Sequence, residues 1–238
     1  PGCVFECVYL ARPDTQISGR SVNETRVDIG RRLARQFPAE DADLVIPVPE
    51  SGNPAAVGYA RESGITFAHG LVKNAYVGRT FIQPTQTLRQ LGIRLKLNPL
   101  KEVIAGKKLV VVDDSIVRGN TQRALIRMLR EAGAAEVHVR IASPPVKWPC
   151  FYGIDFASPG ELIANVASSD DPEVICQTIC EAIGADSLGF VSVDEMIAAT
   201  EQPRSQLCAA CFDGHYPLGL PAGNPNAEAV RTLMSQNS

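Results

Sequence analysis

The chain has 238 residues, 45% of them hydrophobic and 21% charged, which is enough to bury a substantial core as one large domain or two small ones. Its 23 basic and 26 acidic side chains give a net charge of −3, which provides no overall attraction to nucleic acid or to a membrane surface. No apolar run approaches the roughly 18 to 20 residues that span a bilayer, and the first residues do not resemble a signal peptide, so we expect a cytoplasmic protein.

The first predicted element is a helix from about Val22 to Phe37. Ser21 and Glu24 have the spacing of a capping box, and apolar side chains recur along one face, at Val22, Ile29, Leu33 and Phe37. The other face carries four arginines, which we interpret as a solvated basic face: Arg26, Arg31, Arg32 and Arg35.

A short buried strand is predicted from Leu44 to Pro49, followed by a polar loop at Glu50 to Pro54 and a helix from Ala55 to Glu62. Another strand is expected at Ile65 to Val72. The stretch from Lys73 to Leu97 is rich in Gly, Gln, Arg and Thr and has no regular period, so it predicts a long functional or disordered loop.

The strongest pattern lies between Lys108 and Ala142. Apolar Leu109 to Val112 predicts a strand, Thr121 to Ala132 a helix closed by Gly133, and Val137 to Ala142 a further strand. A strand, a helix and a strand in this order form a crossover unit and imply a parallel sheet. Together with the earlier strand, loop and helix, they predict an α/β doubly wound core.

The last third of the chain predicts added helices. Ser169 to Pro172 has the residues that begin a helix, which would run to Ile183, and Ser192 with Glu195 would cap another that ends near Thr200. From Leu220 onward Gly, Pro, Asn, Ala and Ser dominate without an apolar period. We therefore expect residues 220–238 to form a disordered tail.

Two adjacent acidic residues, Asp113 and Asp114, follow the apolar run that ends at Val112. Ligands of open α/β sheets bind at the carboxyl ends of strands, and a ribose diol with Mg²⁺ would suit neighbouring carboxylates. Small residues at the start of the next helix would offer backbone N–H groups to a phosphate: Ser115, Gly119, Asn120 and Thr121. The alternative is that the two Asp side chains only end a strand and help to cap a helix.

The twelve residues from Val110 to Thr121 resemble the signature of type I phosphoribosyltransferases. Other segments resemble amidophosphoribosyltransferases in particular, which are the glutamine-dependent enzymes that open purine synthesis. These segments are Arg12 to Asp14, Val48 to Gly52, Lys73 to Pro84 and Ser143 to Asp155. The resemblance implies a type I phosphoribosyltransferase fold over residues 1–219, with added C-terminal helices and a cluster-binding segment.

The resemblance also implies roles for individual residues. Asp113 and Asp114 would contact the ribose hydroxyls and Mg²⁺, with Ser51 also at the metal and the pyrophosphate. The diphosphate loop would comprise Glu50, Ser51 and Gly52. The 5-phosphate of phosphoribosyl pyrophosphate would lie on a continuous loop of Ser115, Ile116, Val117, Arg118, Gly119, Asn120 and Thr121. A loop that closes over the substrate would carry the catalytic residues Lys73, Tyr76, Arg79 and Thr80.

Four of the seven cysteines are candidate metal ligands. Cys208 and Cys211 form a C-x-x-C pair, with Cys3 and Cys150 as possible distant partners, and the spacing leaves zinc, iron–sulfur and chance open. Some amidophosphoribosyltransferases resemble this chain in having four cysteines at these places, which implies a [4Fe–4S] cluster. The other three are interpreted as small core residues: Cys7 on a strand-like run, and Cys176 and Cys180 beside Val174 and Ile183.

No segment resembles the glutaminase half that would precede Cys3 in this family, so we expect the chain alone to use ammonia rather than glutamine. The family implies a homotetramer, a glutaminase domain in the same polypeptide and inhibition by purine nucleotides. Two alternatives remain: a non-catalytic module that senses phosphoribosyl pyrophosphate, and a transferase acting on a nucleobase such as orotate. The absence of a DNA-binding signal argues against the first, and the cysteine set argues against the second.

Overall fold

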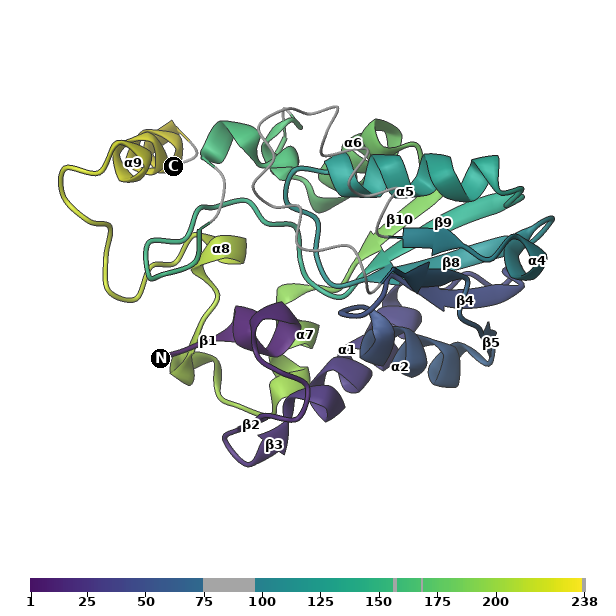
Figure 1. Cartoon of the computed structure of the whole chain (residues 1–238). Coiled ribbons are helices and arrows are strands. Elements are labelled where there is room, and N and C mark those ends of the chain that lie inside the picture. The colour runs from purple at the N-terminus through teal and green to yellow at the C-terminus, as the bar shows by residue number, and fades with distance from the viewer. Residues whose placement is uncertain (75–96, 156–157, 168, 237–238) are drawn as a thin grey trace.

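A computed structural model describes residues 1–74, 97–155, 158–167 and 169–236. Its centre is a five-stranded sheet in which every neighbouring pair is parallel (Figure 1). In spatial order the strands are β10 (Ser187–Phe190), β9 (Glu136–Ile141), β8 (Lys108–Asp113), β4 (Leu44–Pro47) and β5 (Thr66–Phe67). The predicted α/β fold with a mainly parallel sheet is confirmed.

Helices cover both faces of this sheet (Figure 1). One face carries α1 (Val22–Gln36), α2 (Asn53–Ser63) and α7 (Val193–Thr200). The other carries α5 (Asn120–Glu131) and α6 (Pro172–Ile183), while the short α4 (Lys101–Ile104) leads into β8. The predicted caps are present, because Ser21, Asp171 and Ser192 each accept a hydrogen bond from a backbone N–H in the first turn of the helix that follows.

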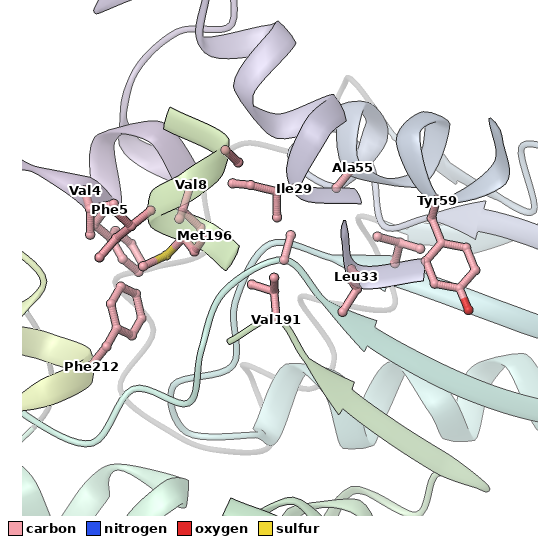
Figure 2. Packing of buried hydrophobic residues seen from close by; sticks show 14 of the residues in the cluster. Val4, Phe5, Val8, Ile29, Leu33, Ala55, Tyr59, Val191, Met196 and Phe212 are labelled. Carbon is pink, nitrogen blue, oxygen red and sulfur yellow. The ribbon is translucent and has the colours of Figure 1, made fainter. Parts of the chain in front are cut away.

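Side chains of the central strand β8 contribute to the hydrophobic core on each face of the sheet. Val110 and Val112 belong to the hydrophobic cluster under α1 and α2, whereas Leu109 and Val111 belong to the cluster under α5 and α6. Successive side chains of a strand point to opposite faces, so a strand covered on both faces is apolar at every position. This explains the unbroken run Leu109 to Val112. Figure 2 shows part of the first cluster, including Ile29, Leu33 and Tyr59.

The N-terminal strand meets a much later segment of the chain beside this first cluster. β1 (Gly2–Cys3) pairs in parallel with β11 (Leu207–Cys208), and it is followed by η1 (Glu6–Leu10), a short π-helix. Phe5 and Phe212 lie with their ring centroids 5.9 Å apart, and Figure 2 shows them facing each other. The remaining elements here are β2 (Gln16–Ile17), β3 (Arg20–Ser21), η4 (Arg204–Gln206) and α8 (Ala210–Asp213).

Several predicted boundaries differ from the structure. The expected strand at Ile65 to Val72 is two strands, β5 and β6 (Leu71–Lys73), and β6 pairs antiparallel with β7 (Leu97–Pro99). Gly70 separates β5 from β6, and a Cβ there would lie 2.8 Å from the Ile46 side chain, so close packing requires the glycine at this break. Two short 3₁₀ turns, η2 (Pro159–Glu161) and η3 (Ile163–Asn165), precede α6.

The predicted disordered tail is not observed over most of its length. A helix, α9 (Pro225–Gln236), lies within it, and Ala227 and Val230 are fully buried. Their spacing of three residues places both on one helix face, but two modest apolar side chains are too weak a pattern to predict a helix. No helix among the described residues has the length and apolar character needed to cross a membrane.

Three smaller expectations are also wrong. Arg26 is 4% exposed rather than solvated, because it points from α1 towards η1 and donates to backbone carbonyls there. Cys7 lies in η1 rather than in a strand, although it is buried as expected. Val174 is 41% exposed, so only Ile183 of the two predicted neighbours of Cys176 and Cys180 is in the core.

Candidate active site

The order in which the chain adds strands to the sheet changes direction between the neighbouring strands β4 and β8. From β4 it continues through α2 to β5, and from β8 it continues through α5 to β9, so the two connections diverge from neighbouring strands. In open α/β sheets ligands bind at such a switch point, beyond the carboxyl ends of the strands. Two loops emerge there, residues 48–52 after β4 and residues 114–119 after β8.

The first loop is tied closely to β8. The Val48 N–H donates to the Val112 carbonyl at 2.9 Å, and the Gly52 N–H donates to the Val48 carbonyl at 3.0 Å. A Cβ on Gly52 would lie 2.4 Å from the Val112 oxygen, so only glycine fits this close approach. The Pro49–Glu50 peptide bond is cis, Glu50 is exposed and Ser51 is half-buried. The predicted diphosphate loop therefore lies directly beside the acidic pair.

The acidic pair is held by hydrogen bonds from several directions. Asp113 accepts from the Asp114 N–H at 2.8 Å and from the Gln122 side-chain amide. Asp114 accepts from the hydroxyls of Ser115 and Ser51. Predicted site residues from the two loops thus meet at one carboxylate. Gln122 was not among the site residues predicted from the sequence.

Burial shifts the acid–base properties of both carboxyl groups. Asp113 is 6% exposed and Asp114 is 9% exposed. Burial raises the pKa of Asp113 well above its ordinary value, and the adjacent charge of Asp114 raises the pKa of Asp113 further. Burial also raises the pKa of Asp114, although the serine hydroxyls and the positive charge of Arg26 oppose the effect. A pair of this kind gains from any ligand that brings positive charge or hydroxyl donors.

The second loop leads into the start of α5. Gly119 has φ +75°, and a Cβ there would lie 2.4 Å from Ile163 Cδ1, so backbone conformation and space both favour glycine. Ile116 is buried, and the Val117 carbonyl accepts from the Ile163 N–H at 2.9 Å. Beyond this anchored turn, the first N–H groups of α5 have no acceptor within the helix, which suits an anion.

The polar residues at the rim of this loop are more accessible. Arg118 is exposed and forms an ion pair with Glu161 at 3.2 Å. Asn120 and Thr121 begin α5, where the Asn120 side chain accepts from Arg123 at 3.3 Å and Thr121 is exposed. Ser115 to Gly119 therefore form the loop after β8, and Asn120 and Thr121 are the first residues of α5 at the same switch point.

Lys73 connects a third segment to the same place. It ends β6, and its Nζ lies 3.5 Å from Glu50 Oε2 in an exposed ion pair. Two residues that are distant in the sequence are thereby brought together beside the diphosphate loop. The other three residues predicted for the closing loop, Tyr76, Arg79 and Thr80, lie outside the described residues.

The four candidate cluster cysteines converge from three parts of the chain. Cys3 and Cys208 are opposite each other in the β1–β11 pair. Burial raises the pKa of Cys211 far above the ordinary thiol value, and the charges of Cys3, Cys150 and Cys208 raise it further. The Cys150 sulfur accepts from the Tyr152 N–H at 3.3 Å. No three of the described His, Cys, Asp and Glu side chains are arranged as ligands of one metal ion.

A family model for the phosphoribosyl transferase domain matches residues 22–143, more than half of the chain. The match covers β4, β8, α5 and both loops of the switch point. This chain belongs to the phosphoribosyltransferase family. The resemblance to the type I phosphoribosyltransferase signature is confirmed, and it lies on the segment that the structure places around the acidic pair.

Curated relatives of this phosphoribosyltransferase are amidophosphoribosyltransferases. The chain is 73% identical to that of Mycobacterium leprae over 221 residues, which cover 93% of this chain and 39% of the relative. It is 53% identical to that of Synechococcus elongatus, covering 92% of this chain and 43% of the relative. The chain therefore spans less than half the length of these relatives.

Solved structures also match this chain over most of its length. The glutamine phosphoribosylpyrophosphate amidotransferase of B. subtilis, in a complex with ADP and GMP, is 47% identical, with a TM-score of 0.78. The match covers 90% of this chain and 46% of that one. A second structure, described as the allosteric regulatory enzyme of purine biosynthesis, matches with the same identity and TM-score.

Two residues of this phosphoribosyltransferase were missed as contributors to the site. Gln122 is 2% exposed and donates to Asp113, and its own carbonyl oxygen is buried without a hydrogen-bond partner in the part of the chain that the structure describes. The sequence predicts α5 from its apolar stripe alone. Nothing in the sequence shows that the polar side chain of Gln122 is buried and directed towards Asp113. Arg26, whose charge acts on Asp114, is one of four arginines in the sequence of α1, and the pattern does not distinguish it from the other three.

Proposed function

We propose that this phosphoribosyltransferase is an amidophosphoribosyltransferase. The reaction transfers ammonia, derived from glutamine in the complete enzyme, to C1 of phosphoribosyl pyrophosphate. The bond from C1 to the pyrophosphate oxygen breaks, a bond from C1 to nitrogen forms, and nitrogen loses a proton, which yields phosphoribosylamine and pyrophosphate. This would be the first step of purine synthesis. The observation that carries the proposal is the buried Asp113–Asp114 pair between two glycine-bearing loops, in a chain so similar to known amidophosphoribosyltransferases.

The acidic pair would bind the sugar. Asp113 and Asp114 would accept hydrogen bonds from the ribose hydroxyls, and the oxygen donors of both, with the Ser51 hydroxyl, suit Mg²⁺. The fit rests on chemistry visible here, since two buried carboxylates with raised pKa values and a hydroxyl converge at one point. Bound Mg²⁺ would offset the negative charge of the carboxylates and of the diphosphate.

The two loops would bind the two phosphoryl ends of the substrate. Residues Ser115 to Thr121 would hold the 5-phosphate with the N–H groups at the start of α5. Glu50, Ser51 and Gly52 would lie along the diphosphate, with Lys73 close to them. The departing pyrophosphate gains negative charge as its bond to C1 breaks, and Lys73 and Arg79 would stabilise that charge. Tyr76 and Thr80 would complete the loop that excludes water, which competes with ammonia.

The four cysteines would hold a [4Fe–4S] cluster. Each cysteine of such a cluster binds a different iron, so the four sulfurs need not surround one point, as ligands of a single ion must. The pairing of Cys3 with Cys208, and the action of three thiols on Cys211, support this set over a chance distribution. The cluster would be structural, and its ligands Cys3, Cys150, Cys208 and Cys211 take no part in the transfer.

The wider context follows from the relatives. We propose a cytoplasmic homotetramer in which a glutaminase domain of the same polypeptide supplies ammonia, and in which purine nucleotides inhibit. Residues 1–219 would form the transferase domain with its cluster-binding segment. The B. subtilis structure with ADP and GMP motivates the nucleotide proposal.

Pyrophosphate release from phosphoribosyl pyrophosphate tests the function directly. The purified chain with Mg²⁺ should release pyrophosphate with ammonia and not with glutamine. Asp114→Asn should lower kcat/KM by about 100-fold or more, because a group aimed at the reacting sugar is lost. Asp170→Asn, which alters an exposed carboxylate paired with Lys147, is the matched control and should be unchanged.

Two results would overturn the proposal. One is a folded chain that releases no pyrophosphate with ammonia. The other is full activity and full substrate affinity in a variant that carries amides at both Asp113 and Asp114.

A further inference from the structure

The predicted 5-phosphate loop contacts the turns η2 and η3 at three consecutive residues. The Val117 carbonyl accepts from the Ile163 N–H at 2.9 Å, and the Arg118 guanidinium forms an ion pair with Glu161 at 3.2 Å. Gly119 lies so close to the Ile163 side chain that a Cβ there would be 2.4 Å from Ile163 Cδ1. The backbone of the loop therefore depends on a segment that lies more than forty residues later in the chain.

Residues 158–165, which we call the bracing segment, are fixed both internally and by the core. The Ser158 N–H and the Ser158 hydroxyl both donate to Glu161 Oε2, at 3.1 Å and 2.8 Å. Leu162 and Ala164 are buried, and Leu162 belongs to the hydrophobic cluster under α1 and α2, whereas Ala164 belongs to the cluster under α5 and α6. A segment that contacts both clusters gives the loop a firm support.

Asn165 ties the end of the bracing segment to a third part of the chain. Its Nδ2 donates to the Pro159 carbonyl at 2.8 Å and to the Lys147 carbonyl at 2.9 Å. The Lys147 N–H donates in turn to the Cys211 carbonyl at 3.0 Å. A side-chain amide nitrogen carries two hydrogens, so Asn165 uses both for these carbonyls. One side chain thus closes the bracing segment on itself and anchors it to the chain around Lys147.

We propose that Asn165 is a positioning residue for the 5-phosphate loop and that it acts through Ile163. The proposal rests on the proposed function, because that function gives the loop its ligand. The N–H groups at the start of α5 take their direction from the backbone at Val117 and Gly119, which contact Ile163. Several N–H groups bind one phosphate together, so a small shift of the loop weakens them all. The diphosphate loop, residues 48–52, is tied to β8 instead and should not depend on Asn165.

Two variants test the two contacts of the bracing segment separately. Asn165→Leu keeps the approximate size of the side chain and adds no charge near the phosphate, but it has no N–H to donate. Ile163→Val removes only the Cδ1 methyl group that packs on Gly119. Asn23→Leu is the matched control, since Asn23 is exposed on α1, across the sheet. The measurements are the Kd of ribose 5-phosphate and of pyrophosphate, each with Mg²⁺, and amide hydrogen exchange in residues 115–121.

Asn165→Leu should raise the Kd of ribose 5-phosphate about tenfold, as expected for two lost hydrogen bonds, and that of pyrophosphate by no more than about twofold. Ile163→Val should raise the Kd of ribose 5-phosphate about threefold. Exchange in residues 115–121 should be faster in both variants, and Asn23→Leu should match the unaltered chain in every measurement.

The selectivity between the two ligands separates positioning from a general loss of stability. The proposal is overturned if both ligands weaken equally, or if the folded Asn165→Leu variant binds ribose 5-phosphate as tightly as the unaltered chain. If Asn165→Leu does not fold, Ile163→Val decides by the same criteria. Hydrogen exchange needs no ligand, so unchanged exchange in residues 115–121 refutes the positioning role even in an active enzyme. An unaltered chain that releases no pyrophosphate refutes the proposed function, and exchange then still decides whether Asn165 positions the loop.

Discussion

Asp113 and Asp114 place two adjacent carboxyl groups where water reaches neither side chain freely. Hydroxyls and an amide donate hydrogen bonds to them, and the positive charge of Arg26 favours the ionised form of Asp114. Ionising both buried groups therefore carries an electrostatic cost that a cationic or hydroxyl-bearing ligand would relieve. At this scale, function and stability oppose each other.

Asp114→Asn is expected to stabilise the ligand-free protein at neutral pH although it lowers kcat/KM. The pKa of Asp114 is higher in the folded than in the unfolded chain, so the wild-type free energy of unfolding falls as pH rises from about 3.9 through the raised folded pKa. The variant lacks this fall. Urea unfolding at pH 4 and pH 7 measures the difference, which should grow with pH. A difference that shrinks towards pH 7 would contradict the assigned direction of the shift.

Gln122→Met tests the hydrogen bond that orients Asp113. Methionine preserves the length of the side chain but cannot donate, and a hydrogen bond to a charged group contributes about 1.5–3 kcal/mol. We expect kcat/KM with ammonia to fall by about tenfold or more, with a higher Mg²⁺ requirement. Gln177→Met, on the exposed side of α6 beside Glu181, serves as the control. An unchanged Mg²⁺ requirement would argue against orientation of Asp113 by Gln122.

At the scale of elements, the contact between α1 and α2 is unusually close. A Cβ on Gly30 would lie 1.9 Å from the Ala55 carbonyl oxygen, and one on Gly58 would lie 1.9 Å from the Val27 carbonyl oxygen. Each helix therefore presents a glycine to the backbone of the other. Because α2 begins directly after Gly52, this contact also sets the position of the diphosphate loop.

Gly30→Ala should destabilise the fold by about 3 kcal/mol, since the added methyl group must separate two packed helices. In an unconstrained helix the same change would stabilise by about 0.5–1 kcal/mol, so the sign alone is diagnostic. Chemical denaturation measures the loss. Gly160→Ala provides the comparison, because that glycine is exposed and a Cβ there meets nothing within 4 Å. Equal stabilities of the two variants would rule out the close contact.

Elements with a long, regular apolar period were predictable, and elements that depend on distant partners were not. α1, α5 and α6 have such patterns, α1 and α6 also have side-chain caps, and the bounds of all three agree with the expected ones to within a residue or so. β10 has four residues and is defined by its pairing with β9, which no local pattern reveals. The segment of η1 resembles a strand in its sequence, and its helical form depends on distant contacts, among them the hydrogen bonds from Arg26 to its carbonyls.

The candidate site divides in the same way. Asp113, Asp114 and the glycine turns stand in one contiguous motif, so residue chemistry and family resemblance both indicated them. Gln122 reaches Asp113 from α5, and only the folded chain brings its amide within hydrogen-bond distance of that carboxylate. Lys73 was predicted from resemblance, and its contact with Glu50 is consistent with a place beside the diphosphate loop.

At the scale of the whole molecule, the cysteine set connects the beginning, the middle and the end of the chain. We expect anaerobically purified protein to be brown and to contain four irons per chain, as a [4Fe–4S] cluster requires. Cys208→Ala should lose the colour and most of the iron. Cys176→Ala should keep both, because Cys176 lies on α6, and burial raises the pKa of its thiol to about 11. A colourless wild-type protein that contains zinc would refute the cluster.

The pairing of β1 with β11 also determines how the molecule would bear tension. The two strands are parallel and only two residues long, and they join residues 2–3 to residues 207–208. If Pro1 were pulled away from Ser238, the load would pass across this short ladder in shear before it reached the sheet between them. An optical-trap experiment should then record an early, small extension when β1 separates from β11. A separate and larger extension should follow when the five-stranded sheet unfolds.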